Sequence, residues 1–153
     1  MSSGPQILKP LELGIIVSNL ETSKTFYGDY LGLEPQREIS ISADVGARTG
    51  VAREGFTIYR FIAPCGTVIK LLKRSGPQSD RAAVRSEQCS RLADTFLTLV
   101  VDDLEALTER LTSEGVAGPE GEAQIKIVRP GMRLAFVHDP DGYPIELVEY
   151  SDA

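Results

Sequence analysis

The alternation of apolar and polar positions occurs twice along the chain. Residues 13–21 form an apolar run that ends at an Asn, and residues 97–105 form a similar run that ends at an Asp pair. After each run, apolar residues recur at helical spacing, as far as Gly32 in the first copy and Gly115 in the second. Asn and Asp favour helix starts and glycine favours helix ends. Each copy is therefore predicted to begin with a strand and a helix.

The two copies also end alike. Residues 56–72 and 132–148 each hold two apolar runs around a turn, Ala-Pro-Cys-Gly at 63–66 and Asp-Pro-Asp-Gly at 139–142. Proline at the second turn position and glycine at the fourth are typical of a tight reversal between antiparallel strands. Each copy thus reads as strand, helix and three strands.

This repeat predicts the domain organisation. A first βαβββ module is expected over 8–73 and a second over 92–150, joined by a linker over 74–91 that is rich in Ser, Gln and Arg. Neither module can cover both faces of its own sheet, so we expect the two to pack as one structural unit of the α+β class.

Composition argues against two classes of binding partner, nucleic acid and membrane. The 153 residues include 16 Lys and Arg against 22 Asp and Glu, a net charge of -6. This balance argues against a groove that tracks nucleic-acid phosphates. No apolar run approaches the roughly 18 residues of a membrane span, and the N-terminus lacks a signal-peptide core. We expect a cytoplasmic protein that binds neither nucleic acid nor membrane.

The inventory of ligating residues is small. The chain has two cysteines, no CxxC motif and one histidine, His138. A Cys/His zinc cluster is therefore excluded, as is a Ser-His-Asp or Cys-His site that does not use His138.

Strand alternation assigns side chains to faces of the sheets. The first strand of each copy has one apolar face, which we expect to pack on the helices. The opposite face carries Glu12 in copy one, and Phe96 and Thr98 in copy two. The same reasoning places Lys70 and Glu146, of the last strands, on that opposite face, with Leu72 and Val148 near them.

Loop length predicts the strand pairing. With a four-residue loop in each hairpin, Tyr59 lies opposite Lys70, and Arg133 lies near Glu146 on the concave face. The same count places Arg60 on the helix side.

These segments resemble the vicinal-oxygen-chelate superfamily, which includes glyoxalase I, methylmalonyl-CoA epimerase, extradiol dioxygenases and bleomycin-resistance proteins. The resemblance rests on residues within 17–33, on 101–104 and on 133–147. It implies two βαβββ modules that form a cupped, barrel-like mixed sheet around a small-molecule cavity.

Metal-dependent members of that superfamily usually bind a divalent ion through one side chain from each of four strands. The matching positions here are Glu12, Lys70, Phe96 and Glu146, of which only Glu146 is a usual ligand. A protonated lysine has no lone pair and repels a dication, and a phenyl ring cannot coordinate. We expect no ordinary metal centre and no cofactor, and we expect His138 to lie at the surface or at a hairpin end.

We hypothesise that Lys70 replaces the metal as the cation between Glu12 and Glu146. Burying an unpaired charge costs several kcal/mol, so the carboxylates should hold the ammonium. This triad has one surplus negative charge. One carboxylate would then hold a proton, or the site would prefer a cationic or hydrogen-bond-donating ligand.

Two functions follow from the resemblance and these residues. The first is a metal-independent enzyme that uses acid-base chemistry for isomerisation, dehydration or cyclisation of a small carbonyl or natural-product substrate. Its candidate catalytic residues are Glu12, Tyr59, Lys70 and Glu146, and its candidate substrate-binding residues are Phe61, Leu72, Phe96, Thr98, Arg133 and Val148.

The second function is sequestration of a drug, as in bleomycin-resistance proteins, with Tyr59, Phe61 and Phe96 as a stacking surface. A third, a metal-dependent lyase or epimerase that uses Glu12, Glu146 and water ligands, is the least favoured. The resemblance implies a homodimer. It leaves open the substrate and whether the modules pair within one chain or swap between two.

Overall fold

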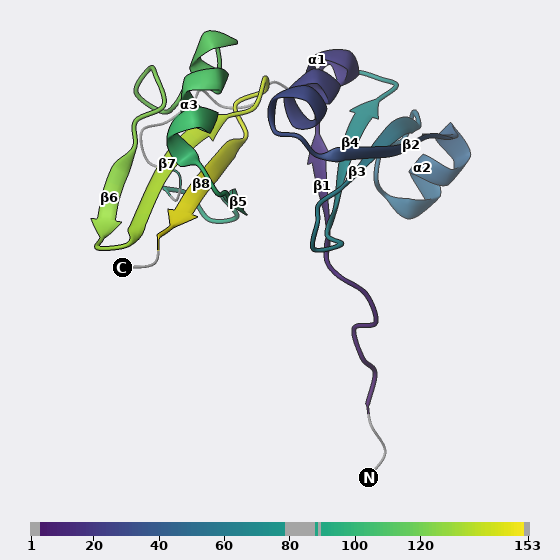
Figure 1. Ribbon diagram of the computed structural model, residues 1–153. Coiled ribbons are helices and arrows are strands. Elements are labelled where there is room, and N and C mark those ends of the chain that lie inside the picture. Colours follow the sequence, from purple (N-terminus) through teal and green to yellow (C-terminus); the bar gives the residue numbers. More distant parts are fainter. Residues whose placement is uncertain (1–3, 79–87, 89, 152–153) are drawn as a thin grey trace. The chain divides into compact units, whose positions relative to one another are not determined.

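Two units, Met1–Gln78 and Ser79–Ala153, make up the chain, and each contains one four-stranded sheet (Figure 1). The computed structural model describes residues 4–78, 88 and 90–151. Most of the linker predicted over 74–91 lies outside the described residues.

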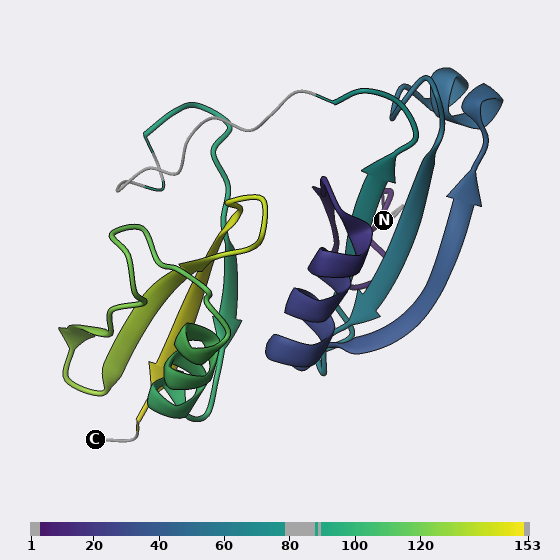
Figure 2. The same cartoon turned by 90° about the horizontal axis from the view of Figure 1, so that it is seen from above.

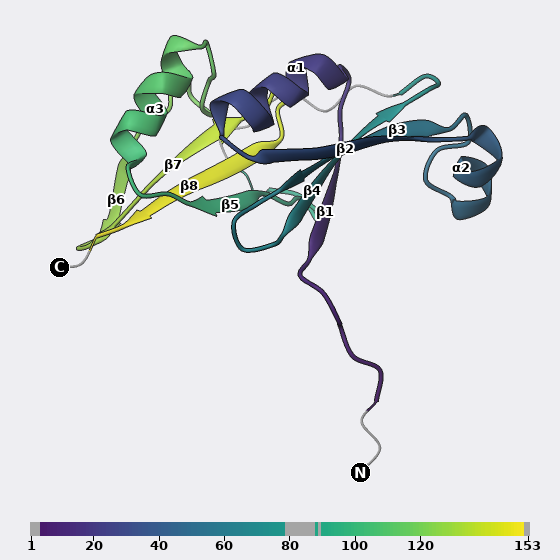
Figure 3. The ribbon, with the colours of Figure 1, turned by 45° about the vertical axis from the view of Figure 1, so that its right-hand side comes forward.

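The first unit has a mixed sheet with strand order β1-β4-β3-β2. Strand β1 runs parallel to β4, and the other neighbours are antiparallel. Its elements in chain order are β1 (Glu12–Ile16), α1 (Leu20–Lys24), the π-helical segment η1 (Thr25–Tyr30), β2 (Glu34–Ile41), α2 (Ala43–Thr49), β3 (Phe56–Ile62) and β4 (Val68–Arg74). The short helix α2 was not expected from the sequence; it lies beyond the end of β2 (Figure 3).

Helix α1 begins where the sequence predicted a cap. The backbone N–H of Thr22 donates to Asn19 Oδ1 over 3.0 Å, which satisfies an N–H that the helix itself leaves without a partner. Phe26 and Tyr27, in the η1 continuation, are buried. The α1–η1 segment lies over one face of the first sheet (Figure 2).

The second unit repeats this arrangement without the extra helix. Its strand order is β5-β8-β7-β6, and β5 runs parallel to β8. Its elements are β5 (Leu97–Val100), α3 (Leu104–Ser113), β6 (Lys126–Arg129), β7 (Met132–His138) and β8 (Pro144–Tyr150). Asp103 caps α3, since its Oδ1 accepts the N–H of Ala106 over 2.9 Å.

The helix-facing sides of the sheets form the core of each unit. In the first unit, the buried side chains on this side include Ile15, Phe61, Ile69 and Leu71; in the second, they include Ala135, Val137, Ile145 and Leu147. The apolar faces that alternation assigned to β1, β4 and β8 are confirmed. The α+β class and the two βαβββ modules with mixed sheets are confirmed as well.

The β3–β4 and β7–β8 hairpins close with three-residue loops, not four. The N–H of Ala63 donates to the carbonyl of Thr67, and that of Asp139 to Tyr143, each over 2.9 Å. Gly66 and Gly142 each have a positive φ, 87° and 83°. A left-handed glycine that ends a three-residue loop is a common hairpin geometry, and it moves the pairing by one residue relative to a four-residue loop.

This shift corrects the predicted register. Lys70 lies opposite Arg60, so the expectation that Tyr59 faces Lys70 was wrong. In the second unit Phe136 lies opposite Glu146, and Arg133 lies opposite Glu149. A one-residue slip exchanges the two faces of a strand. The faces predicted for β3 and β7 are therefore reversed.

Among the described residues, no helix is long and apolar enough to cross a membrane.

Candidate functional site

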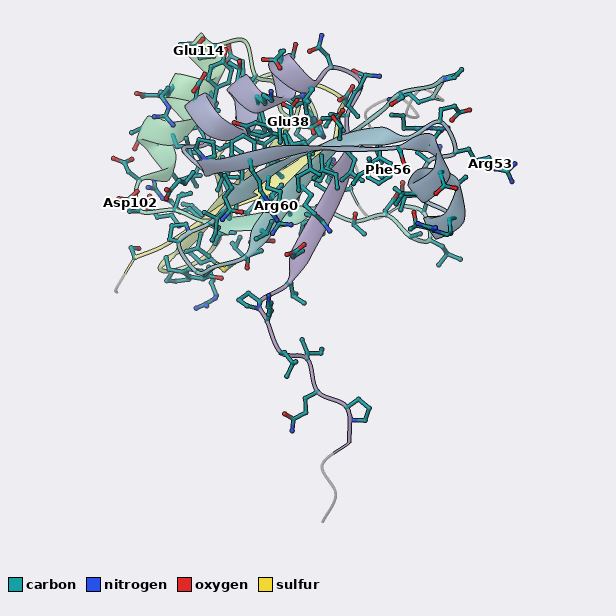
Figure 4. The ribbon with its side chains drawn as sticks, turned by 90° about the vertical axis from the view of Figure 1, so that its right-hand side faces the viewer. Glu38, Arg53, Phe56, Arg60, Asp102 and Glu114 are labelled. Carbon is teal, nitrogen blue, oxygen red and sulfur yellow. The ribbon has the colours of Figure 1, made fainter. Side chains whose placement is uncertain are left out.

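Three charged side chains meet on the face of the first sheet that points away from α1. Arg60 Nη2 donates to Glu12 Oε1 over 3.0 Å, and Arg60 Nη1 donates to Oε2 over 3.3 Å. Lys70 Nζ lies 3.2 Å from the same Oε2. We call Glu12, Arg60 and Lys70 the charge cluster. Figure 4 shows Arg60 beside β1, whereas Glu38 lies on the side of α1.

Strand pairing brings the charge cluster together. Lys70 in the middle of β4 has Arg60 of β3 on one side and Gly14 of β1 on the other. Glu12 precedes Gly14 by two residues, so alternation places it on the same face. The remaining nitrogen of the guanidinium, Arg60 Nε, donates to Gln36 Oε1 over 3.5 Å.

The cations control the ionisation of Glu12. Hydrogen bonds from Arg60 and then from Lys70 lower the pKa of the Glu12 carboxyl below its ordinary value. Glu12 is therefore not the carboxylate that holds a proton near neutral pH. The predicted register placed Arg60 on the other face, so we expected Lys70 as the one cation beside Glu12. The structure places two cations there, Arg60 and Lys70.

Two of the predicted site residues of β3 lie on the helix side. Tyr59 packs edge-on against Phe61, with ring centroids 5.1 Å apart, and Lys24 Nζ of α1 lies 4.4 Å from the Tyr59 ring centroid. Phe61 is 1% exposed. The register shift turns both rings to the helix side, where Phe61 is buried and Tyr59 is half-buried, so the face predicted for them was wrong.

The second unit carries Glu146 on the face of its sheet that points away from α3. Thr98 Oγ1 of β5 donates to Glu146 Oε1 over 3.0 Å. Phe136 lies opposite Glu146 in β7, and Phe96 packs edge-on against Phe136 with ring centroids 5.5 Å apart. Phe96 is 37% exposed. The structure thus brings Phe96, Thr98 and Glu146 together, as alternation suggested, and adds Phe136.

The two aliphatic candidates differ in exposure. Leu72 is half-buried on the face of Lys70 and lies against the open position above Gly14. Val148 shares the face of Glu146 but is only 1% exposed.

Arg133 lies on the helix side, contrary to expectation. Its Nη2 donates to Glu149 Oε1 over 2.7 Å, and Glu149 Oε2 accepts the N–H of Leu104, the first residue of α3, over 2.7 Å. The Leu104 N–H and then Arg133 lower the pKa of Glu149. Arg133 thus holds the start of α3 and is placed away from Glu146.

His138 is the last residue of β7 and lies at a hairpin end, as expected, but it is buried rather than at the surface. Its Nε2 lies 3.3 Å from Gln88 Oε1.

The donor set of the first unit does not fit a divalent metal. Both oxygens of Glu12 already accept hydrogen bonds from cationic groups, and the Lys70 ammonium offers no lone pair. Within each unit, the described residues contain no group of three His, Cys, Asp or Glu side chains placed to hold an ion.

Arg60 is the functional candidate that sequence reasoning missed. It is a charged residue in the apolar run Phe56–Ile62, and a charge at such a position needs an oppositely charged or hydrogen-bonding partner. The glycine at the end of each turn was the available signal, since it is typical of a three-residue hairpin loop.

Comparisons with known proteins agree with this fold. A family model described as the glyoxalase/bleomycin resistance protein/dioxygenase superfamily matches residues 9–147. A glyoxalase family protein from Bacillus cereus is 20% identical with a TM-score of 0.81, covering 99% of this chain and 100% of that one.

A trypanothione-dependent glyoxalase I from Leishmania major is 23% identical with a TM-score of 0.66, covering 94% of this chain and 87% of that one. A glyoxalase/bleomycin resistance protein/dioxygenase domain from Frankia sp. is 18% identical with a TM-score of 0.67, covering 98% and 96%. No protein in the curated set matches the sequence.

Proposed function

Because the chain belongs to the glyoxalase/bleomycin resistance protein/dioxygenase superfamily, we propose that it is a metal-independent enzyme that moves a proton on a small carbonyl compound. The observation that carries this proposal is the ion pair between Lys70 and Glu12, reinforced by Arg60. The resemblance assigns Glu12 and Lys70 to positions where metal-dependent relatives hold ligands. In this chain, fixed ammonium and guanidinium groups supply the positive charge there.

Each charged group has a separate role in this proposal. Lys70 stabilises the oxyanion that develops on the substrate carbonyl, since a preorganised cation in a partly dehydrated site acts strongly on developing charge. Glu146 is the general base, and Thr98 orients it by the 3.0 Å hydrogen bond. Glu12 holds the two cations, because its lowered pKa makes it a poor proton acceptor.

The proposed step is abstraction of a proton from the carbon next to the carbonyl. The C–H bond breaks, its electron pair forms the enolate, and the proton moves to a Glu146 oxygen. Return of the proton from Glu146 to another carbon gives isomerisation, while its transfer to a departing β-hydroxyl releases water and gives dehydration. Attack of the enolate carbon on a second carbonyl within the substrate, whose oxygen then takes the proton from Glu146, gives cyclisation.

Solvent-deuterium exchange tests the proposal. Chelator-treated protein is incubated in D₂O with a panel of small enolisable ketones and 2-oxo acids, and loss of the α-proton signal is followed by ¹H NMR. We expect exchange without added metal and a loss of about 10²-fold or more in Glu146→Gln. Lys70→Met should lower the rate similarly, whereas Lys73→Met, which changes the same residue type on the helix side of β4, should not. Exchange that needs an added metal contradicts the proposal.

The alternative is a protein that binds and sequesters a small molecule. The half-exposed Phe96 ring beside Phe136 favours it, because exposed aromatic pairs provide stacking area. A compound that binds at one site per chain and is recovered unchanged, with no α-proton exchange, would support this function. We also propose a homodimer, which sedimentation equilibrium tests.

A further inference from the structure

The charge cluster has more positive than negative charge. Glu12 shares one carboxylate between Arg60 and Lys70, which leaves a sum of +1 from two cations and one anion. The Arg60 side chain is only 19% exposed and that of Lys70 is 30% exposed. Surplus charge that is partly removed from water is costly unless it is paired. An anion from outside would offset that cost.

The cations also keep donors for such an anion. A guanidinium has five N–H groups and an ammonium has three. Arg60 directs two of them at Glu12 and one at Gln36, and Lys70 directs one at Glu12. Among the described residues, no protein acceptor takes the remaining two N–H groups of each side chain.

Gly14 leaves the approach to Lys70 open. It is the β1 neighbour of Lys70, and a Cβ placed on it would meet only Leu72 Cδ1 at 3.4 Å. A glycine inside a strand often marks a place where another molecule approaches the backbone. An anion can therefore reach Lys70 across the Gly14 backbone, beside the apolar Leu72.

We propose that the charge cluster binds a permanent carboxylate group of the ligand, and that Arg60 is the residue that determines this specificity. The inference rests on the proposed function and deepens it, because it assigns the substrate to the small carboxylic acids. A monoanion matches the surplus of one positive charge within the charge cluster, whereas a phosphate dianion exceeds it; Arg37, the exposed β2 neighbour of Arg60, lies outside this sum because water screens its charge. The planar fork of Arg60, which already binds Glu12 through both terminal nitrogens, suits a second carboxylate.

Paired titrations with benzoate and the neutral isostere benzamide test this inference. The readouts are the ¹⁵N–¹H signals of the Gly14 amide and of the Arg60 Nε in the full-length protein. We expect saturable shifts with benzoate and at least about tenfold weaker binding of benzamide, as the loss of charge-assisted hydrogen bonds implies. Arg60→Gln should weaken benzoate binding about tenfold, and Arg60→Lys less, since lysine keeps the charge without the fork.

Two further variants separate charge from folding. Arg53→Gln changes an exposed arginine in the loop between α2 and β3, away from Arg60 (Figure 4), and should leave benzoate binding unchanged. Glu12→Gln removes the competing carboxylate and should strengthen benzoate binding several-fold. A loss in Arg60→Gln together with a gain in Glu12→Gln cannot come from unfolding.

Three results would overturn the inference: benzamide binding as tightly as benzoate, no benzoate shift at Gly14 or Arg60, or tighter binding of phenylphosphonate. In any of these cases, α-proton exchange on neutral ketones would still support the proposed function. Conversely, selective benzoate binding without exchange on any carbonyl compound would contradict the proposed function and leave the carboxylate site in place.

Discussion

Arg60 and Glu12 form an ion pair, with Nη2 and Oε1 3.0 Å apart, although their strands β3 and β1 do not pair with each other. Strand β4 lies between them and contributes Lys70, which lies 3.2 Å from the same carboxylate. The pair therefore depends on the hairpin register, because a slip of one residue would turn Arg60 to the helix side.

The ionisation of Glu12 should report directly on its two cations. Its pKa is lowered, so the stabilisation from this carboxylate is present above the ordinary value of 4.5 and is lost as the pH falls through the lower folded-state value. We expect the ¹³C signal of the Glu12 carboxyl to titrate below 4.5 in the native protein. In Arg60→Gln and in Lys70→Met the midpoint should rise. An unchanged midpoint in both variants would show that neither cation acts on Glu12.

Tyr59 should matter for stability and not for ligand binding. Tyr59→Ala removes a ring that packs on Phe61 and lies under Lys24; we expect a loss of about 2 kcal/mol in the free energy of unfolding, measured with urea. Tyr59→Phe keeps the ring and should leave both stability and benzoate binding close to native. A large loss of binding or activity in Tyr59→Phe would show that the Tyr59 hydroxyl takes part in the site.

Gly14 should matter for ligand binding and not for stability. The added methyl of Gly14→Ala meets only Leu72 at an ordinary contact distance of 3.4 Å, so we expect a change of less than about 1 kcal/mol in the free energy of unfolding. The same methyl stands over the approach to Lys70 and should weaken benzoate binding several-fold. Native affinity in a folded Gly14→Ala protein would place the ligand elsewhere.

Glu149 should anchor the start of α3. Glu149→Ala removes the acceptor of the Leu104 N–H and the partner of Arg133, so we expect a lower melting temperature and faster amide hydrogen exchange in the first turn of α3. Because the pKa of Glu149 is lowered, this stabilisation should hold above the ordinary value and fade on acidification. Glu105→Ala, an exposed carboxylate in that turn, is the control. Equal effects of the two variants would contradict the assignment.

The strands, caps and buried faces could be predicted because they depend on local pattern. A period of two residues assigns a face within one strand, and Asn19 and Asp103 satisfy helix N–H groups of their own segments. Helix α2 escaped prediction because it has only seven residues, and Val45 is its one large apolar side chain. Gly46 in that helix is typical of a loop in sequence. In the structure the helix needs a glycine there, because a Cβ would collide with the Ala52 carbonyl.

The site was harder to predict because it depends on pairing between strands. The faces of Lys70 and Glu146 were predicted correctly, since each alternates with buried residues of its own strand. Arg60, Tyr59 and Arg133 were assigned to the wrong faces because one residue in the hairpin loop changes every partner.

Crystals grown with Mn²⁺ or Zn²⁺ test the central claim, that fixed cations occupy the place of a metal ligand set in the first unit. We predict no anomalous difference peak within coordination distance of the Glu12 oxygens, with Arg60 and Lys70 still bound to them. A peak at about 2.0–2.2 Å from Glu12, with Lys70 displaced, would contradict the account.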